Sequence, residues 1–324
     1  MARHYTLDEL AILSGATRDQ IGTWAREGKL GTLASNGTGA PGYGFEQAER
    51  ALALGGRTTH RRISVVNQKG GVGKTTTVFT LAAAMADLGR RVLAVDLDAQ
   101  ANLTSSFGYD PDTLELTSED LLTDERTAPE DVILETAIEG LHLIPADIKL
   151  CRADVKIQEM FMRELILQNK LRHLFDHYHV ILFDCPPNLS RVTINALLSS
   201  DEVVVPVETQ SYSIKALSDL TSTFSLICAK MNHLLRVWIL PTKVDRSSAL
   251  ATEFLRALDQ SFGERMLPGV SADSDIVKAP MIYEPVVRSF PDSTSAKEYR
   301  RLASFLMLPD SERDAAAREP KRAI

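Results

Sequence analysis

A glycine-rich loop that carries two lysines is the clearest candidate for chemistry in this sequence. It reads Lys69-Gly-Gly-Val-Gly-Lys-Thr-Thr76 and follows a run of β-branched residues at 63–67. Glycines let a backbone wrap around a phosphate with its N–H groups turned inward, and a helix that starts near Gly73 would point its positive end at the same group. The usual pattern G-x-x-x-x-G-K-[ST] is not met, because Gln68 occupies its first glycine position. We therefore predict that the loop is an unusual variant of this phosphate-binding motif and binds a nucleotide, rather than being a simple glycine turn.

The residue types of this loop indicate two ligands, ATP and Mg²⁺. Lys74 is expected to reach the β- and γ-phosphates of ATP, and the Thr75 hydroxyl is expected to coordinate the metal. Lys69 is expected to point away from its own phosphates and to reach the nucleotide of a facing subunit; a solvent-exposed lysine is the alternative. The expected ATP-binding residues of the loop are Lys69, Gly70, Gly71, Val72, Gly73, Lys74, Thr75 and Thr76.

Three aspartates stand where two apolar runs end. Asp96 and Asp98 share one face of the first run, because side chains on a strand repeat every two residues. Asp98, the outer one, is expected to orient the attacking water, and Asp96 to fix the metal shell or the loop, or to cap the next turn. Asp184 closes the second run, where a carboxylate on a rigid strand would lie near Mg²⁺ and act through water. The candidate catalytic residues are Lys69, Lys74 and Asp98, and the candidate metal ligands are Thr75 and Asp184.

Six apolar runs rich in β-branched residues must position these groups. The runs are continuous rather than alternating, which is typical of strands buried on both faces, and helical patterns separate most of them. This rhythm predicts an α/β fold, a mostly parallel twisted sheet with helices on both faces as in P-loop NTPases, whose ligands bind at the carboxyl ends of the strands. Asp98, Asp184 and the loop at 68–76 all fall at such ends. The predicted strands are Ile63–Asn67, Val92–Asp98, Leu141–Pro145, Val180–Asp184, Glu202–Val207 and Val237–Pro241.

The composition excludes several classes of protein. The chain of 324 residues carries a net charge of −7, so a uniformly basic coat for nucleic acid is excluded, although local basic patches are not. Cys151, Cys185 and Cys228 are too far apart in sequence to suggest a zinc site or a disulfide framework. The N-terminus has no apolar signal region, and no apolar run approaches the roughly 20 residues of a membrane helix. We therefore expect a cytoplasmic protein that does not enter a membrane.

Turn-forming stretches divide the chain into three parts. Residues 31–44 and the Gly55-Gly-Arg-Thr-Thr-His segment are rich in glycine and other turn formers. We expect a small module at 1–57, an ATPase domain at 58–309 and a flexible charged tail at 310–324.

The small module is predicted to be a helix-turn-helix. Thr6 and Glu9 form a capping box, and Thr17 can cap a second helix after a turn at Gly15. The pattern resembles the MerR-type winged-helix group, with residues 31–44 in place of the wing and residues 45–54 as a closing helix. The second helix would then enter a major groove and expose Arg18, Thr23 and Arg26 to DNA. A helical module for dimerisation or docking is the alternative.

The motifs together resemble those of ParA-type partition ATPases, relatives of MinD and the nitrogenase iron protein. The resemblance covers about residues 61–307 and rests on the glycine loop, on Asp96-Leu-Asp98-Ala-Gln-Ala-Asn and on Asp184-Cys-Pro-Pro, in that order. Further matches are Val203–Leu217, Leu240–Arg246 and Ser295–Ala303. The resemblance implies an ATP-dependent homodimer that binds DNA without sequence preference in the nucleoid, and a ParB-like partner that stimulates slow hydrolysis. It also implies that Lys69 crosses the dimer interface and that Asp98 is the hydrolysis aspartate.

Two departures from that family affect the expected contacts. Ala99 stands where the family usually has proline, and the family's adenine-contacting Pro-Arg-Asn appears here as Pro268-Gly-Val270. Backbone contacts from Pro268 and Val270 to adenine are still expected, whereas a side-chain amide contact at Val270 is not. The family's basic DNA-binding positions are not clearly matched. Arg246 and Lys278 are the candidates, with ordinary solvated surface as the alternative.

Three other functions stay open at this point. A MinD-like positioning ATPase would need an amphipathic C-terminal helix, which the charged tail lacks. A metabolic P-loop enzyme, such as a cobyrinic-acid-type synthase, would share the ATP site but would not need the N-terminal module. A nucleotide-regulated transcriptional repressor would use residues 1–57 as its DNA reader, and a partition ATPase with such a module could also repress its own operon.

Overall fold

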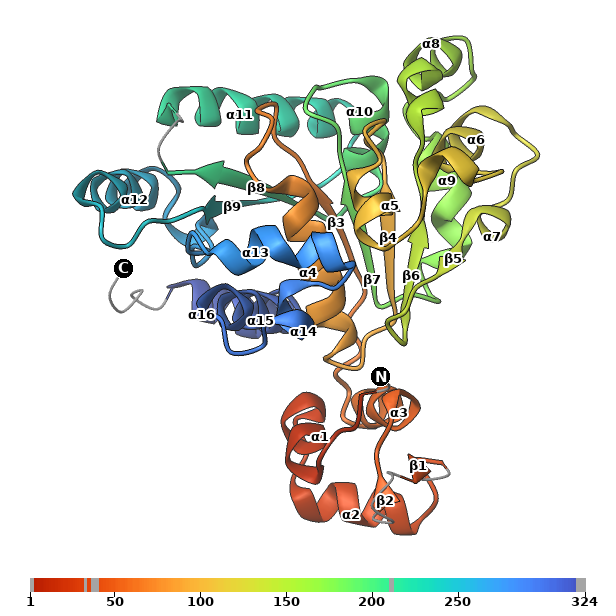
Figure 1. The fold of residues 1–324 in the computed structure, drawn as a ribbon, viewed down its shortest axis with the longest axis vertical. Helices are drawn as coiled ribbons and strands as arrows, with labels where there is room; N and C mark the ends of the chain where they lie inside the picture. Colours follow the sequence, from red (N-terminus) through yellow and green to blue (C-terminus); the bar gives the residue numbers. More distant parts are fainter. Residues whose placement is uncertain (1–2, 32–33, 36–40, 210–212, 319–324) are drawn as a thin grey trace.

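A seven-stranded sheet organises the body of the protein in this computed structural model, which describes residues 3–31, 34–35, 41–209 and 213–318. The strand order is β5-β6-β4-β7-β3-β8-β9, and every neighbouring pair is parallel except β5 with β6 (Figure 1). The strands are β3 (Arg61–Val65), β4 (Val92–Asp96), β5 (Leu134–Glu135), β6 (Leu141–Ile144), β7 (Val180–Asp184), β8 (Glu202–Glu208) and β9 (Arg236–Thr242).

The six predicted strands are confirmed, and their ends differ from the prediction by at most two residues. β7 lies between β4 and β3, so the carboxyl ends of these three strands are neighbours. The sequence analysis missed β5, because two residues are too few to produce a pattern. The order brings Asp96 directly opposite Asp184 and places Val65, just before the glycine loop, on the other side of Asp184.

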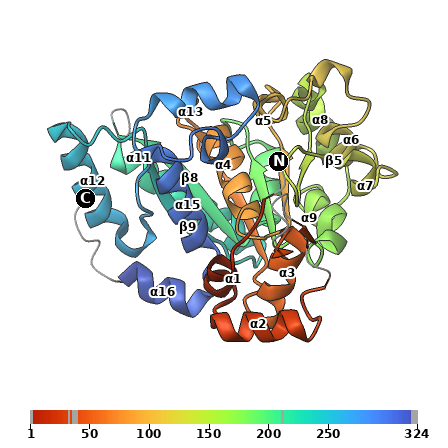
Figure 2. The same ribbon diagram turned by 60° about the horizontal axis from the view of Figure 1, so that its bottom comes forward.

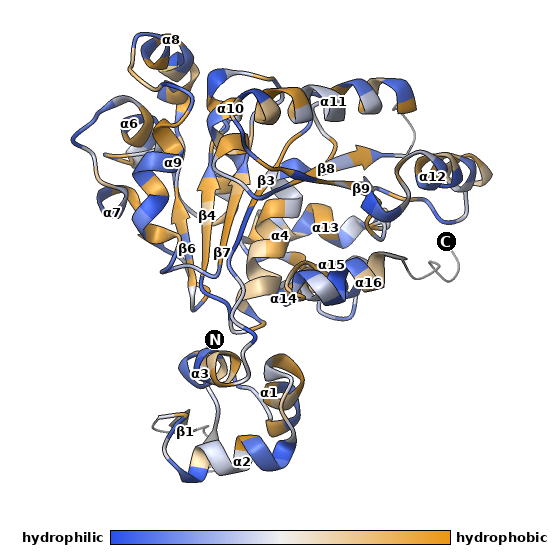
Figure 3. Ribbon diagram, turned by 180° about the vertical axis from the view of Figure 1, so that it is seen from behind, coloured by the Kyte–Doolittle hydropathy of each residue, from blue (hydrophilic) through white to orange (hydrophobic). Residues whose placement is uncertain are grey.

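Helices cover both faces of the sheet. On one face α4 (Lys74–Ala86), α14 (Val286–Ser289) and α15 (Thr294–Leu306) enclose one apolar cluster, and α9 (Ile166–Leu171), α10 (Arg191–Leu198), α11 (Ile214–Lys230) and α12 (Ala249–Phe262) enclose a second cluster on the other face. Figure 3 shows the apolar strands between helices whose outer sides are hydrophilic. The remaining helices of this body are α5 (Asn102–Ser106), α6 (Ser118–Thr123), α7 (Pro129–Val132), α8 (Ala153–Gln158), α13 (Ser274–Lys278) and α16 (Asp310–Arg318).

The N-terminal residues form a separate helical module. It contains α1 (Leu7–Ser14), α2 (Arg18–Arg26) and α3 (Phe45–Leu54), with a short antiparallel pair β1 (Ala34–Ser35) and β2 (Pro41–Gly42). Both predicted caps are present: the Thr6 hydroxyl accepts from Glu9 N and the Thr17 hydroxyl from Gln20 N. The module has its own small core. Residues 32, 33 and 36–40 of the expected wing lie outside the described residues.

The module packs against the body at the carboxyl end of α4, far along that helix from the glycine loop (Figure 2). The Tyr5 hydroxyl donates to Ala86 O over 3.3 Å, and Arg90 donates to Arg57 O over 2.6 Å. The backbones approach so closely that a Cβ on Gly89 would lie 2.8 Å from the Cβ of Ala48. The module is therefore seated on the body through side-chain and main-chain contacts.

The tail expected to be flexible from residue 310 is instead a helix, α16, as far as Arg318. Its anchor is Arg313, which is 1% exposed and donates from Nη1 to both carboxylate oxygens of Glu202, at 2.7 and 2.8 Å. The guanidinium also lies 5.4 Å from the centre of the Trp238 ring. A charged sequence does not reveal that one of its arginines has a partner in the interior. Residues 319–324 lie outside the described residues.

Candidate nucleotide site

The glycine loop connects β3 to α4 and has the backbone that its sequence predicts. Gly71 and Gly73 have φ angles of 74° and 94°, in the left-handed region that favours glycine. The loop is fixed from the neighbouring strands, because Thr242 Oγ1 donates to Val72 O over 2.8 Å and Asn67 Nδ2 donates to Pro206 O over 2.7 Å. The loop is thus held in its curved form by the protein itself.

Lys74 and Thr75, near the end of the glycine loop, are the first two residues of α4. Lys74 is the first helical residue and is almost buried, and Gly73 before it provides no side chain to cap the helix. The N–H groups at a helix start have no partner within the helix, and together with the helix dipole they attract an anion. Lys74, Thr75 and these N–H groups therefore form a cationic end that suits a phosphate.

Asp184 is a fully buried carboxylate at the end of β7. Among the described residues, neither of its oxygens accepts a hydrogen bond of good geometry, although the Thr75 hydroxyl lies close enough to lower the pKa of Asp184. Burial and then the neighbouring Asp96 raise the pKa of Asp184 well above its usual range, against the opposing effects of Thr75 and Lys74. A buried carboxylate without donors is costly, whereas a hard cation or its bound water would satisfy it. Thr75 and Asp184 thus fit a Mg²⁺ site.

Asp96 has a different role from Asp184. It accepts hydrogen bonds from Asp98 N at 3.1 Å, from Thr104 N at 2.9 Å and from Thr104 Oγ1 at 2.7 Å. Burial raises the pKa of Asp96 to about 6 despite these donors. Of the roles expected for Asp96, the structure supports fixing the loop that follows β4.

Asp98 and Lys69 lie near this centre and are less buried. Asp98 accepts from Gln100 N at 3.0 Å, and its charge contributes to the raised pKa of Asp184. The Lys69 ammonium lies 3.5 Å from a carboxylate oxygen of Glu208, at the end of β8. Their assigned roles in hydrolysis and across a dimer stay predictions.

A pocket of about 400 Å³ adjoins the glycine loop. Gly73 and Thr76 form one side, and the opposite wall is largely apolar, with Val270, Ile276 and Val277. Its position next to the phosphate loop and its lining suit the base and sugar of a nucleotide. The full lining is Gly73, Thr76, Thr242, Lys243, Val270, Ser271, Ala272, Asp273, Ser274, Ile276, Val277 and Tyr299.

The expected backbone contacts to adenine from Pro268 and Val270 stay predictions. Pro268 is exposed and does not line the pocket. Val270 lines it with its side chain, but its N–H donates to Pro241 O at 2.8 Å and its carbonyl accepts from Val244 N at 3.0 Å. These bonds attach the segment to the end of β9, so the main chain of Val270 has partners already. Sequence reasoning missed the wall from Ser271 to Val277, which carries no glycine or motif signal.

The residues predicted to contact DNA fall into two separate groups. Arg18, Thr23 and Arg26 lie on α2; Arg18 forms an ion pair with Asp8 at 3.0 Å, and Arg26 donates to Thr23 Oγ1 at 3.1 Å. Both arginines are exposed on the module.

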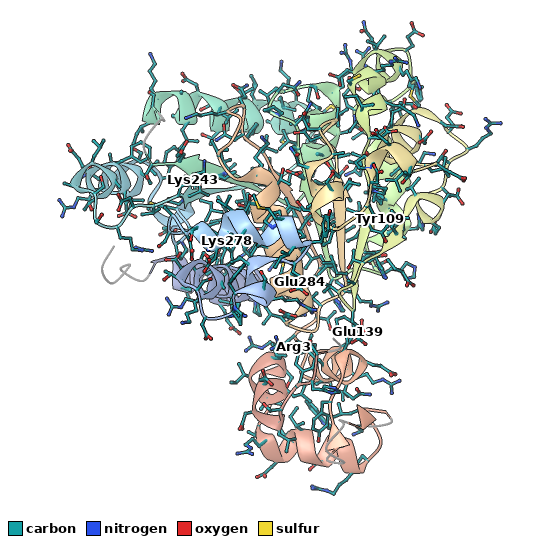
Figure 4. All side chains as sticks on the ribbon, viewed as in Figure 1. Arg3, Tyr109, Glu139, Lys243, Lys278 and Glu284 are labelled. Carbon is teal, nitrogen blue, oxygen red and sulfur yellow. The ribbon has the colours of Figure 1, made fainter. Side chains whose placement is uncertain are left out.

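Arg246 and Lys278 lie on the body and have acidic partners, Glu298 and Asp275, each at 2.8 Å. In Figure 4, Lys278 lies on the body, well away from the N-terminal module, to which Arg3 belongs. The assignment of these two residues to DNA stays a prediction.

Clusters of metal-binding side chains and membrane-spanning helices are both absent from the described residues. No group of three or more His, Cys, Asp or Glu side chains that could hold a metal occurs among them. No helix in the described part of the chain is long and apolar enough to cross a membrane.

Known proteins resemble this chain over most of its length. A family described as an AAA domain matches residues 60–237. The sporulation initiation inhibitor protein Soj of Bacillus subtilis is 36% identical over 243 residues, which cover 74% of this chain and 96% of Soj. The chromosome-partitioning ATPase Soj of Thermus thermophilus is 37% identical over 253 residues, covering 78% and 97%.

A solved structure has a similar fold and carries a nucleotide analog. Cobyrinic acid a,c-diamide synthase from Mycobacterium smegmatis, with bound ATP analog and magnesium, matches with a TM-score of 0.67 and 30% sequence identity. The match covers 77% of this chain and 95% of that one.

Proposed function

Because the chain belongs to the family of Soj and ParA partitioning ATPases, we propose that it is an ATP-dependent DNA-segregation ATPase. The observation that carries the proposal is Asp184, a fully buried carboxylate that, within the described residues, is approached by the Thr75 hydroxyl but accepts no hydrogen bond of good geometry, beneath a glycine loop that ends in Lys74 and Thr75. ATP with Mg²⁺ supplies what this arrangement lacks, a cation for Asp184 and Thr75 and an anion for Lys74 and the start of α4.

In this proposal the chain positions ATP and does little covalent chemistry. Magnesium, when bound, neutralises charge on the β- and γ-phosphates. Lys74 and the loop N–H groups hold the phosphates, Thr75 and Asp184 hold the metal, and the apolar pocket holds the base. Asp98 orients the attacking water and accepts its proton.

The ATP-bound form is proposed to be a homodimer that binds DNA without sequence preference. Lys69 crosses from one subunit to the nucleotide of the other, which requires that it leave Glu208. A ParB-like partner stimulates a slow hydrolysis, and the protein then leaves DNA. This places the protein in the cytoplasm and on the nucleoid.

A nucleotide-regulated repressor is the second candidate, and the N-terminal module favours it. The module has its own core, and α2, on which Arg18 and Arg26 are exposed, lies on the side of the module away from the body (Figure 1). These features suit a MerR-like helix in a major groove, and operon autorepression could accompany partition.

Two other candidates have less support. The synthase from Mycobacterium smegmatis shares the fold, but a metabolic enzyme has no need for a helix-turn-helix. A MinD-like positioning ATPase would need an apolar helix face for a membrane, whereas α16 holds its buried arginine against Glu202.

The proposal is tested by binding to random and upstream DNA, each without nucleotide, with ADP and with ATP. We expect ATP to promote dimerisation and tight binding to both DNAs, with an affinity that falls steeply as salt is added. Lys74→Ala should lose both effects. A preference for upstream DNA alone would favour the repressor, and calorimetry that detects no ATP uptake with magnesium would overturn both.

A further inference from the structure

The pocket wall next to the phosphate loop is held by a pair of charged residues that do not line the pocket. Glu298 of α15 accepts from Ser271 N at 2.7 Å and from Ser271 Oγ at 2.8 Å. Arg246 donates from Nη2 to Glu298 at 2.8 Å and from Nε to Ser271 Oγ at 3.0 Å. Glu298 therefore fixes both the main chain and the hydroxyl of Ser271, and Arg246 adds a second bond to the hydroxyl.

The helix that carries Glu298 also contacts the phosphate-binding part of the site. Tyr299, the next residue of α15, lines the pocket and shares a hydrogen bond of 3.2 Å with Thr77 of α4. One turn earlier, Ser295 donates to Asp273, another residue of the wall, over 2.8 Å. α15 thus sets the spacing between the wall and the helix that begins at Lys74.

The wall itself depends on such external support. Two main-chain hydrogen bonds attach it to the end of β9 and the residues that follow: Val270 N donates to Pro241 O, and Ala272 N donates to Val244 O. The rest of the wall faces the open pocket. A charge-assisted bond to a largely buried carboxylate is stronger than a neutral one, so Glu298 is the main restraint on Ser271. Arg246 balances the charge of that carboxylate and adds a second bond to the same serine.

We propose that Arg246 and Glu298 are positioning residues for the nucleoside part of ATP, and that Arg246 is not a DNA contact. Through Ser271 they hold the pocket wall at the distance from the phosphate loop at which base and phosphates bind together. This inference rests on the proposed ATP site, and it replaces the role in DNA binding expected for Arg246.

The test separates the two ends of the nucleotide. Binding of ATP and of inorganic tripolyphosphate, which occupies only the phosphate loop, is measured by calorimetry with magnesium for Arg246→Ala and Glu298→Gln. We expect ATP affinity to fall about tenfold and tripolyphosphate affinity to stay unchanged. Arg246→Lys should recover part of the loss, and the double variant should lose little more than either single one, because the pair acts as a unit.

Controls make each outcome decisive. Arg256→Ala, at an exposed arginine of α12, should bind both ligands as the parent does. Ser271→Ala removes the hydroxyl but keeps the bond from Ser271 N to Glu298. This variant replaces Arg246→Ala or Glu298→Gln in the comparison if either of them does not fold. Unchanged ATP affinity, or an equal loss for both ligands, overturns the inference. So does a loss of DNA affinity in Arg246→Ala at saturating ATP. A parent protein that binds no ATP would instead refute the proposed function.

Discussion

Asp96 and Asp184 stand directly opposite each other on neighbouring parallel strands, but within the described residues Asp96 accepts three hydrogen bonds and Asp184 accepts none of good geometry. The two carboxyls are both buried, and the charge of Asp96 helps to raise the pKa of Asp184. The difference in their donors assigns different roles. Asp96 is satisfied within the protein and holds the loop after β4, whereas Asp184 depends on a partner from outside.

A first prediction concerns the pH dependence of stability in the absence of nucleotide. The pKa of Asp184 is raised in the folded state, which means that the folded protein favours the protonated side chain. The stability that this protonated side chain contributes is fully present below the pKa that Asp184 has in the unfolded chain. It is lost as pH rises through the pKa of Asp184 in the folded protein. Asp184→Asn cannot ionise. At neutral pH we therefore expect it to exceed the parent in free energy of unfolding by about 1–3 kcal/mol, the cost of an unsatisfied buried group.

Urea denaturation of both proteins between pH 4 and 8 checks this prediction. The difference in free energy of unfolding should be near zero at the acid end and should grow with pH. Adding ATP and magnesium should stabilise the parent much more than the variant, because the variant binds the metal poorly. A parent that stays more stable than the variant at every pH would contradict the description of Asp184 as an unsatisfied carboxylate.

A second prediction compares two glycines of the loop. Gly71 has φ 74°, so Gly71→Ala should cost roughly 1–2 kcal/mol of stability. Gly70 is outside the left-handed region, and a Cβ there would meet nothing within 4 Å, so Gly70→Ala should leave the melting temperature unchanged. Thermal unfolding without nucleotide measures both. Equal melting temperatures for the two variants would show that the loop is not held in its curved form before ATP binds.

A third prediction separates nucleotide binding from hydrolysis. Asp98→Ala should bind ATP with parental affinity, because Asp98 holds neither phosphate nor metal, while its kcat should fall by about 100-fold or more. The protein should then remain on DNA after ATP is added. Gln100→Ala is the matched control, since the bond to Asp98 comes from the main chain of Gln100 and survives the change. Parental turnover in Asp98→Ala would remove that residue from the mechanism.

The sequence could predict those parts of the molecule that depend on local pattern. Continuous apolar runs gave six strands, and Lys69–Thr76 predicted a phosphate loop, because both signals lie within a few neighbouring residues. The pairing of Arg246 with Glu298, 52 residues away, has no local signal, and so Arg246 was assigned to DNA. The hydrogen bonds of Val270 have no local signal either, because whether its N–H has a partner depends on how its segment lies against β9.

A fourth prediction addresses the helix that replaced the expected tail. Arg313→Ala would leave Glu202 buried without its main partner, and we expect a loss of about 3–5 kcal/mol in the free energy of unfolding. Arg313→Met combined with Glu202→Gln should recover most of it, because the charge is removed and Trp238 Nε1 keeps an acceptor. Asp314→Ala, at an exposed neighbour, should change stability by about 1 kcal/mol or less. Urea denaturation measures all three, and a parental stability for Arg313→Ala would mean that α16 is not anchored.

A fifth prediction concerns the seat of the N-terminal module on the body. Tyr5→Phe removes only the hydroxyl that donates to Ala86 O at the end of α4. Loss of this hydrogen bond should weaken the attachment of the module to the body by about 1 kcal/mol, so the module should leave the body roughly fivefold more often. Hydrogen exchange of the amides at 57–61, between α3 and β3, should speed up by that factor. Tyr43→Phe is the matched control, since Tyr43 belongs to the same small core as Tyr5. If the two variants exchange alike, the hydroxyl of Tyr5 does not hold the module in place, and the other contacts between the module and the body, such as those of Arg90 and Arg57, must hold it.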